Sequence, residues 1–154
     1  MPRVLLLTNL AATLYLVGLI WFVQLVHYPL FDGVGGEGFA AYEARHTRWT
    51  GMVVAPAMLI ELATALLLVW RAPAGVPGWV MPVGLAAVAA LWAVTFFVSV
   101  PQHNVLAAGF DAQAHRLLVG TNWIRTALWT ARGLVLLWVV GRLLGGIEPV
   151  HPAV

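Results

Sequence analysis

Four long apolar runs, separated by short segments rich in glycine, proline and charged residues, dominate the pattern of the chain. A helix needs about 20 predominantly apolar residues to cross the roughly 30 Å hydrocarbon core of a membrane. Four segments meet this requirement: 4–28, 50–70, 79–100 and 117–144. These runs lack the two-residue alternation of a membrane β-barrel strand. The pattern therefore predicts one all-α integral membrane domain, residues 1–154, that forms a bundle of four transmembrane helices with both termini on the same side.

Proline, glycine and charged residues predict where the spans end. Pro29 and the glycine-rich stretch 32–38 follow the first run, and Pro101 ends the third. Before the second span, residues 38–49 have the pattern of an amphipathic helix that lies on the membrane surface. Before the fourth span, we expect residues 111–115 to lie in a loop.

Composition supports the membrane assignment and narrows the chemistry. Hydrophobic residues make up 62% of the 154-residue chain and charged residues only 9%, whereas a soluble domain has about 25% charged residues. The eight basic residues are all arginine and are scattered singly, so we expect no nucleic-acid partner. The chain has no cysteine, which excludes disulfides and thiolate metal ligands. The lipid bilayer is the partner that composition predicts.

The histidines, unlike the arginines, distinguish the two sides of the predicted bundle. Three arginines flank the spans on each side, so the positive-inside rule gives no orientation. We expect a multi-pass protein of a bacterial-type inner membrane with its termini in the cytoplasm. His151 belongs to the C-terminal tail. The other four histidines all fall at span ends on the side opposite the termini: His27, His46, His103 and His115.

Polar residues also recur at helical spacing within the spans. Gln24 and His27 share one face of the first span, because residues three apart lie on the same side of a helix. Asn122 and Arg125 share a face of the fourth span in the same way. The pattern therefore predicts a polar site inside the bundle near one membrane face.

Charged residues in the middle of the spans must face the bundle interior. An ionised side chain at the centre of a bilayer costs about 2.5–3.5 kcal/mol by insertion scales. Glu61 lies near the middle of the second span, and Arg125 and Arg132 lie in the fourth. We predict that Glu61 pairs with one of these arginines. The alternative is a protonated Glu61.

The histidines also suit a metal or haem site. Glu43 and His46 have the Glu-x-x-His spacing that puts a carboxylate and an imidazole on one helical face in di-iron bundles. For Glu43 we favour the alternative, a solvated position on the surface helix. Neutral imidazole binds haem, copper and non-haem iron alike, and a site without any cofactor is equally open. The candidate metal ligands are His27, His46, His103 and His115.

Two segments in the second half of the chain resemble the anthrone-oxygenase-like family of small four-helix membrane proteins. The first, FFVSVPQHNVLAAGFD, has a Pro-x-x-Asn-x-Leu pattern that begins at Pro101. The second, HRLLVGTNWIRTALWTARG, has a polar turn that opens the fourth span, with Asn122, Trp123 and Arg125. The resemblance implies an oxygenase that converts an electron-rich polycyclic phenol to a quinone without a flavin or haem motif.

In such a site, a histidine removes a phenolic proton while an arginine and amides stabilise the resulting oxyanion. The candidate catalytic residues are His27, His103, Arg125, Asn122 and Asn104. The candidate substrate-binding residues are Gln24, Trp123, Trp129 and Glu61. The substrate implied is a hydrophobic small molecule that arrives from the bilayer.

Three other functions remain open. Convergence of at least two histidines favours a haem-, copper- or iron-binding redox protein. A chain of intramembrane charges favours a small transporter. Polar groups within the spans also serve the assembly of an accessory membrane subunit or a homo-oligomer. We rank an oxidoreductase, in particular a monooxygenase, ahead of these alternatives.

Overall fold

A computed structural model describes residues 1–145 of the protein, so His151 lies outside the described residues. All regular secondary structure in this range is helical. The elements in chain order are α1 (Pro2–Phe22), η1 (Val23–His27), η2 (Pro29–Val34), α2 (Phe39–Trp70), α3 (Val80–Val94), η3 (Thr95–Ser99), α4 (Val100–Leu106) and α5 (Ala112–Gly145). The prediction of an all-α, four-helix bundle is confirmed.

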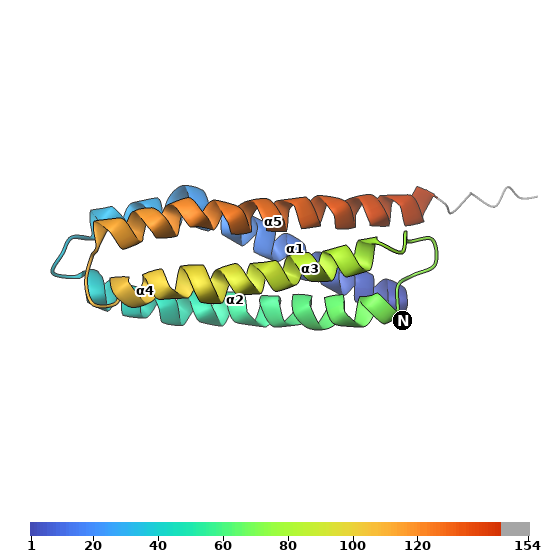
Figure 1. The fold of residues 1–154 in the computed structure, drawn as a ribbon, viewed down its shortest axis with the longest axis horizontal. Helices are drawn as coiled ribbons and strands as arrows, with labels where there is room; N and C mark the ends of the chain where they lie inside the picture. Colours follow the sequence, from blue (N-terminus) through green and yellow to red (C-terminus); the bar gives the residue numbers. More distant parts are fainter. Residues whose placement is uncertain (146–154) are drawn as a thin grey trace, which may run out of the picture.

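The elements form four long helical stretches that run up and down the bundle (Figure 1). α1 continues through η1 and η2, and α3 continues through η3 into α4, whereas α2 and α5 are single helices. α1 contacts α2 and α5, and α3 contacts the same two helices, so the four surround one interior. The N-terminus and the end of α5 lie at the same end of the bundle (Figure 1). All four stretches are long and apolar enough to cross a membrane.

The bundle exposes apolar side chains and buries polar ones. Phe97 is 81% exposed and Trp70 is 75% exposed, whereas Asn9, Glu61 and Asn122 are fully buried. In a bilayer this distribution is favourable, because hydrocarbon solvates the apolar surface and the polar groups must find partners inside the protein. The exposed surface therefore suits lipid as the surrounding solvent.

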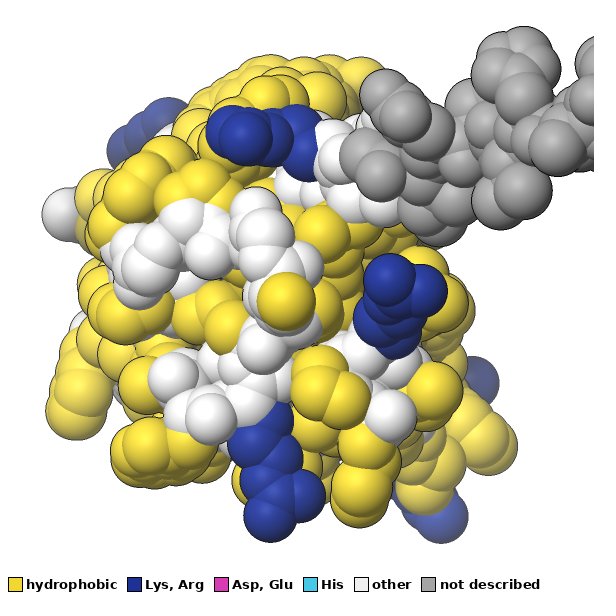
Figure 2. Space-filling view, turned by 90° about the vertical axis from the view of Figure 1, so that its right-hand side faces the viewer, with side chains coloured by type: hydrophobic (Ala, Val, Ile, Leu, Met, Phe, Trp, Pro, Cys, Tyr) yellow, Lys and Arg dark blue, Asp and Glu magenta, His cyan; other side chains and the backbone are white. Residues whose placement is uncertain are grey.

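The two ends of the bundle carry different side chains. Figure 2 looks at the end with the termini and shows arginine side chains among apolar ones, with no acidic side chain or histidine in view. At the opposite end, η1, α2, α4 and α5 each contribute a histidine. Within residues 1–145 the histidines thus lie on one side, as the sequence predicts.

Two segments differ from what the sequence predicted. The separate surface helix at residues 38–49 is a wrong prediction, because residues 39–49 form the first turns of α2. These turns continue the bundle since they direct polar side chains inward, where other helices supply partners. The loop predicted at 111–115 is also wrong. The Asp111 carboxylate accepts hydrogen bonds from the backbone N–H groups of Gln113 and Ala114, at 2.9 and 2.7 Å, and so caps the start of α5.

The third span passes through Pro101 and does not end there. The π-helical segment η3 precedes α4, and Pro101 lies in the first turn of α4, where a missing backbone N–H is tolerated. The other π-helical segment, η1, ends at His27, and η3 ends one turn before His103. A π turn inserts an extra residue and changes the direction of the side chains that follow, and such turns are frequent at functional sites. Both histidines are thus presented by irregular turns.

Candidate functional site

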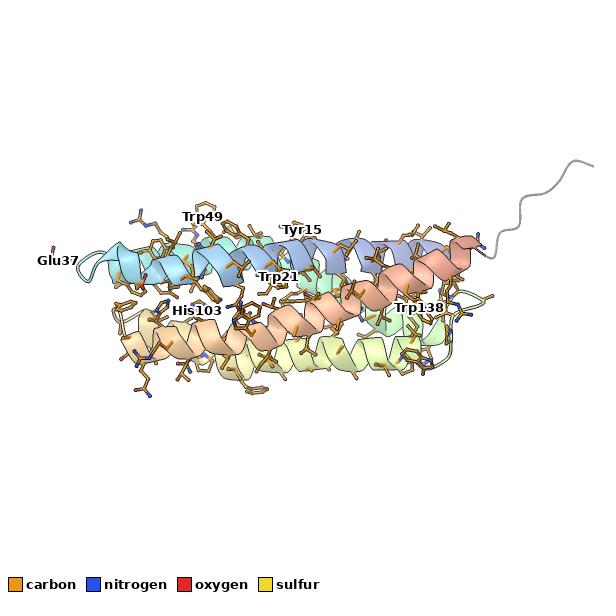
Figure 3. The ribbon with its side chains drawn as sticks, turned by 90° about the horizontal axis from the view of Figure 1, so that it is seen from above. Tyr15, Trp21, Glu37, Trp49, His103 and Trp138 are labelled. Atoms are coloured by element: carbon orange, nitrogen blue, oxygen red, sulfur yellow. The ribbon has the colours of Figure 1, made fainter. Side chains whose placement is uncertain are left out.

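A glutamate and three histidines converge inside the end of the bundle opposite the termini. Glu43 and His46 come from the first turns of α2, His27 from η1 and His103 from α4. Glu43 is fully buried and His46 is 7% exposed. Figure 3 shows His103 among the helices, whereas Glu37 projects from the loop at the tip. We refer to His27, Glu43, His46 and His103 as the histidine cluster.

The side chains of the histidine cluster are in direct contact. His103 Nδ1 lies 2.6 Å from Glu43 Oε1, and His27 Nε2 lies 2.7 Å from His46 Nδ1. The rings of His46 and His103 stack with their centroids 5.2 Å apart. The second carboxylate oxygen, Glu43 Oε2, is buried and has no hydrogen-bond partner among the described residues. An unpartnered oxygen on a fully buried carboxylate is unfavourable unless another group satisfies it.

The cluster has the spacing of a metal-binding group. One ligand atom each from Glu43, His46 and His103 lies within 4.8 Å of the other two, and ligands on opposite sides of one ion are about 4 Å apart. His27 lies beside this group, because its Nε2 is in contact with His46 Nδ1. Sites of two histidines and one carboxylate bind non-haem iron, and imidazole also binds copper and zinc.

A chain of hydrogen bonds connects the histidine cluster to α5. Tyr28 Oη lies 3.0 Å from His103 Nε2 and accepts a hydrogen bond from Arg125 Nη2 at 3.2 Å. Arg125 Nε donates to Asn122 Oδ1 at 3.0 Å. Asn122 Nδ2 donates to Gln24 Oε1 at 2.9 Å, and Gln24 in turn donates to a backbone carbonyl of α5 at 3.2 Å. The structure thus brings these predicted site residues into one network with the histidines.

The guanidinium of Arg125 is bound by neutral groups. Its described hydrogen-bond partners are Asn122 and Tyr28, and neither is a carboxylate. Arg125 is only 7% exposed, so its charge is poorly screened by solvent. The result is a positive group within one hydrogen bond of Tyr28 and two of His103.

A second polar group lies nearer the middle of the bundle. Arg132 Nε donates to Glu61 Oε1 at 3.0 Å, so the predicted pairing of Glu61 with an arginine is confirmed, with Arg132 as the partner. Thr13 donates to the same oxygen at 2.7 Å, and Trp129 Nε1 donates to Glu61 Oε2 at 3.1 Å. Both carboxylate oxygens are therefore satisfied.

The other atoms of this group are satisfied as well. Arg132 Nη1 donates to the carbonyl of Gly84 at 2.8 Å, and Nη2 donates to Asn9 Oδ1 at 2.6 Å. Asn9 Nδ2 donates to the carbonyl of Glu61 at 3.0 Å and to Thr64 Oγ1 at 2.8 Å. We call these residues the mid-span cluster: Asn9, Thr13, Glu61, Thr64, Trp129 and Arg132.

Several predicted site residues lie away from the histidine cluster. Asn104 is exposed on α4, because one residue after His103 a helix has turned by about 100°. Trp123 is 46% exposed and packs edge to face on Trp21, with ring centroids 5.7 Å apart. Trp129 and Glu61 belong to the mid-span cluster.

His115, a candidate metal ligand, is beside the cluster but not in its ligand group. His115 Nε2 lies 2.8 Å from the backbone carbonyl of Tyr28, and its ring stacks on Phe31 at 6.1 Å. These contacts give His115 a role in holding the chain around Tyr28.

Sequence reasoning missed some members of the site. Glu43 is buried, so the preferred prediction of a solvated Glu43 is wrong. Thr50 Oγ1 lies 3.1 Å from His46 Nδ1, one turn further along α2. Tyr28 directly follows His27, but an aromatic residue at a span end is also typical of an interfacial anchor. The four-residue spacing of Thr50 from His46 is the signal that could have found it.

No protein-family model, curated protein or solved structure matches this chain. The resemblance of the two second-half segments to the anthrone-oxygenase-like family therefore remains an expectation.

Proposed function

We propose that the protein is an integral membrane oxidoreductase that uses a first-row transition-metal ion, held by Glu43, His46 and His103, with His27 beside them, near one membrane face. The observation that carries this proposal is the convergence of ligand atoms from Glu43, His46 and His103 within 4.8 Å, together with the unpartnered Glu43 Oε2. A bound cation gives the free carboxylate oxygen a partner, and the imidazoles of His46 and His103 supply nitrogen ligands to it.

The ligand types favour a transition-metal ion over magnesium or calcium. Imidazole suits iron, copper, nickel and zinc, whereas magnesium and calcium take oxygen ligands. The chain has no cysteine, so a thiolate zinc or iron–sulfur site is excluded. The cavity beside the cluster measures about 30 Å³, whereas organic ligand sites measure about 300–1,000 Å³. This tight packing supports an ion rather than a haem.

The redox part of the proposal rests on chemistry and on the resemblance in the sequence. Two histidines and one carboxylate leave coordination positions open on iron, which is the arrangement of non-haem iron oxygenases. The segments that begin at Pro101 and open the fourth span resemble an oxygenase family, which agrees with this reaction class. The substrate that fits a membrane setting is a hydrophobic small molecule, phenolic if the resemblance holds.

A second candidate is oxidation without a metal. The contact of His103 with both Glu43 Oε1 and Tyr28 Oη, at 2.6 and 3.0 Å, forms a carboxylate–imidazole–phenol relay. Such a relay orients an imidazole for general-base catalysis. From the sequence we expect Arg125 to stabilise the oxyanion of a phenolic substrate, but here the Tyr28 phenol lies beside Arg125. An external phenol therefore has to bind next to Tyr28 or displace it.

Elemental analysis of the detergent-purified protein tests the proposal directly. We expect close to one iron or copper ion per chain, with an electron paramagnetic resonance or optical signal that changes on reduction. The double variant Glu43→Gln, His103→Gln should lose the ion. Its matched control is Glu37→Gln, which changes a glutamate at the same end of the bundle but outside the histidine cluster and should retain the ion.

The results separate the two candidates. Zinc as the only bound metal would overturn the oxidoreductase assignment, since zinc is not redox-active. A parent protein that takes up no ion after reconstitution with ferrous or cupric salts would exclude the metal centre. Oxygen consumption with hydrophobic phenols by that metal-free protein, lost in His103→Gln, would then favour the second candidate.

A further inference from the structure

A small cavity lies directly beside the histidine cluster. It is bounded by α1 and η1 on one side, by α2 on another and by α5, and its volume is about 30 Å³. The lining side chains are mostly hydrocarbon: Leu16, Leu19, Ile20, Val23 and Val54, with Trp129. Three polar residues complete the wall: Tyr28, Thr50 and Arg125.

The polar wall of the cavity touches the proposed metal ligands. Tyr28 Oη lies 3.0 Å from His103 Nε2, and Thr50 Oγ1 lies 3.1 Å from His46 Nδ1. Tyr28 is 3% exposed and Arg125 is 7% exposed. A molecule in the cavity is therefore separated from two imidazoles by one hydrogen-bonding side chain each.

The apolar wall of the cavity faces the membrane. Leu19 and Val54 are only partly buried and lie in the first two membrane-spanning stretches, so the hydrocarbon of the bilayer is next to them. A cavity needs about 10–15 Å³ to hold one water-sized molecule, so this one has room for one or two such molecules. Charged solutes cross hydrocarbon at high cost, whereas small uncharged molecules do not carry that penalty.

We propose that this cavity binds a small uncharged molecule, of two or three heavy atoms, that reaches the metal centre from the hydrocarbon of the bilayer. The apolar wall admits an uncharged ligand, and Tyr28, Thr50 and Arg125 orient it beside the imidazoles. We expect anionic ligands to reach the same centre from the end of the bundle, where the His103 side chain is 14% exposed. This inference rests on the proposed metal centre for its role but not for the existence of the binding cavity.

Xenon and methyl NMR test the cavity without any metal. In methyl-labelled protein under xenon pressure, the Ile20 and Val54 methyl signals should shift, because xenon enters small apolar cavities. Val54→Ile adds one methylene to this wall and should abolish the shift of Ile20. The matched control is Val135→Ile in a separate cavity of about 140 Å³ beside Arg132, which should leave the Ile20 response unchanged.

Ligand binding to the ferrous protein tests the route. Val54→Ile should lower the association rate of nitric oxide about tenfold, while azide binding to the ferric form stays as in the parent. Absence of any xenon response at Ile20 would overturn the cavity proposal whatever the metal content. Equal slowing of nitric oxide and azide would overturn the separate route. A protein with the xenon response but without bound metal would overturn the proposed function and confine the inference to the cavity.

Discussion

The two polar clusters differ in how completely their atoms are satisfied. In the mid-span cluster, both oxygens of Glu61 accept hydrogen bonds, and Arg132 reaches acceptors with all three of its nitrogens. In the histidine cluster, Glu43 Oε2 has no described partner, and two imidazoles contact each other. Glu43 and Glu61 are both fully buried in the same bundle, so burial does not explain the difference.

The difference separates a structural role from a functional one. A buried ion pair persists when every donor and acceptor is used, and the mid-span cluster meets that condition without any added group. The histidine cluster keeps one carboxylate oxygen free for a ligand, which costs stability in the empty site. Trp129 joins the two, because its indole N–H binds Glu61 while its ring lines the small cavity beside Tyr28.

Breaking the mid-span ion pair should have the largest effect on folding. Arg132→Met leaves the carboxylate of Glu61 buried without a cation, and we expect the free energy of unfolding to fall by about 3–5 kcal/mol. The measurement is reversible unfolding in detergent or bilayer discs. The double variant Arg132→Met, Glu61→Leu should lose less than the single one, because no charge remains buried. If Arg132→Met were as stable as the parent, the mid-span cluster would have no structural role.

A glycine next to Arg132 offers a milder way to disturb the same cluster. A Cβ atom at Gly84 would lie 2.7 Å from Arg132 Nη1, so Gly84→Ala must displace the guanidinium from the Gly84 carbonyl. We expect a loss of about 1–3 kcal/mol in unfolding free energy. Gly18→Ala is the control, since nothing lies within 4 Å of a Cβ there. That variant should be neutral or stabilised by up to about 1 kcal/mol.

Much of the fold could be predicted because lipid imposes one simple rule on the pattern. Long apolar runs must be helices, and an even number of them places both termini on the same side. The ends of the helices were less predictable. Residues 39–49 are not apolar enough to read as part of a span, yet Glu43 and His46 turn inward and extend α2. Partners on other helices decide that outcome, and a single segment does not reveal them.

The site was predictable only where helical spacing carries the information. Gln24, Asn122 and Arg125 lie together as their spacing indicated. Asn104 was expected in the site because of the Pro-x-x-Asn-x-Leu pattern and not because it shares a helix face with other site residues, and its side chain is exposed. The choice of Arg132 over Arg125 as the partner of Glu61 depends on depth in the bundle, which the sequence gives only approximately.

Removing the Tyr28 hydroxyl beside the histidine cluster should affect metal binding more than folding. Tyr28→Phe deletes the contacts to His103 and Arg125, and we expect a loss of about 0.5–1.5 kcal/mol in unfolding free energy. Mutation of a group that orients a metal ligand commonly lowers the metal affinity about 10–100-fold. A competition titration with a chelator measures this affinity. Tyr15→Phe, at a tyrosine that is 50% exposed on α1 and visible in Figure 3, should change neither quantity. Equal metal affinity in the parent and Tyr28→Phe would contradict this assignment.

Glutamate-to-glutamine substitution at Glu43 and at Glu61 compares the two clusters most directly. The substitution at Glu43 should have the smallest effect on folding. In the metal-free protein, Glu43→Gln removes a buried charge that lacks a full set of partners, so the free energy of unfolding should change by less than about 1 kcal/mol. Glu61→Gln leaves the Arg132 guanidinium without its carboxylate and should be clearly destabilising.

Added metal should make the stability of the protein depend on Glu43. At a free metal concentration 100 times Kd, binding stabilises the parent by about 2.7 kcal/mol, and the same stabilisation should appear in Glu37→Gln. Glu43→Gln should lose it, because the carboxylate ligand is gone while the amide is a weaker donor to the ion. If Glu43→Gln destabilised the metal-free protein as much as Glu61→Gln does, both clusters would be structural, since a carboxylate kept for a ligand contributes little to the fold until that ligand is bound.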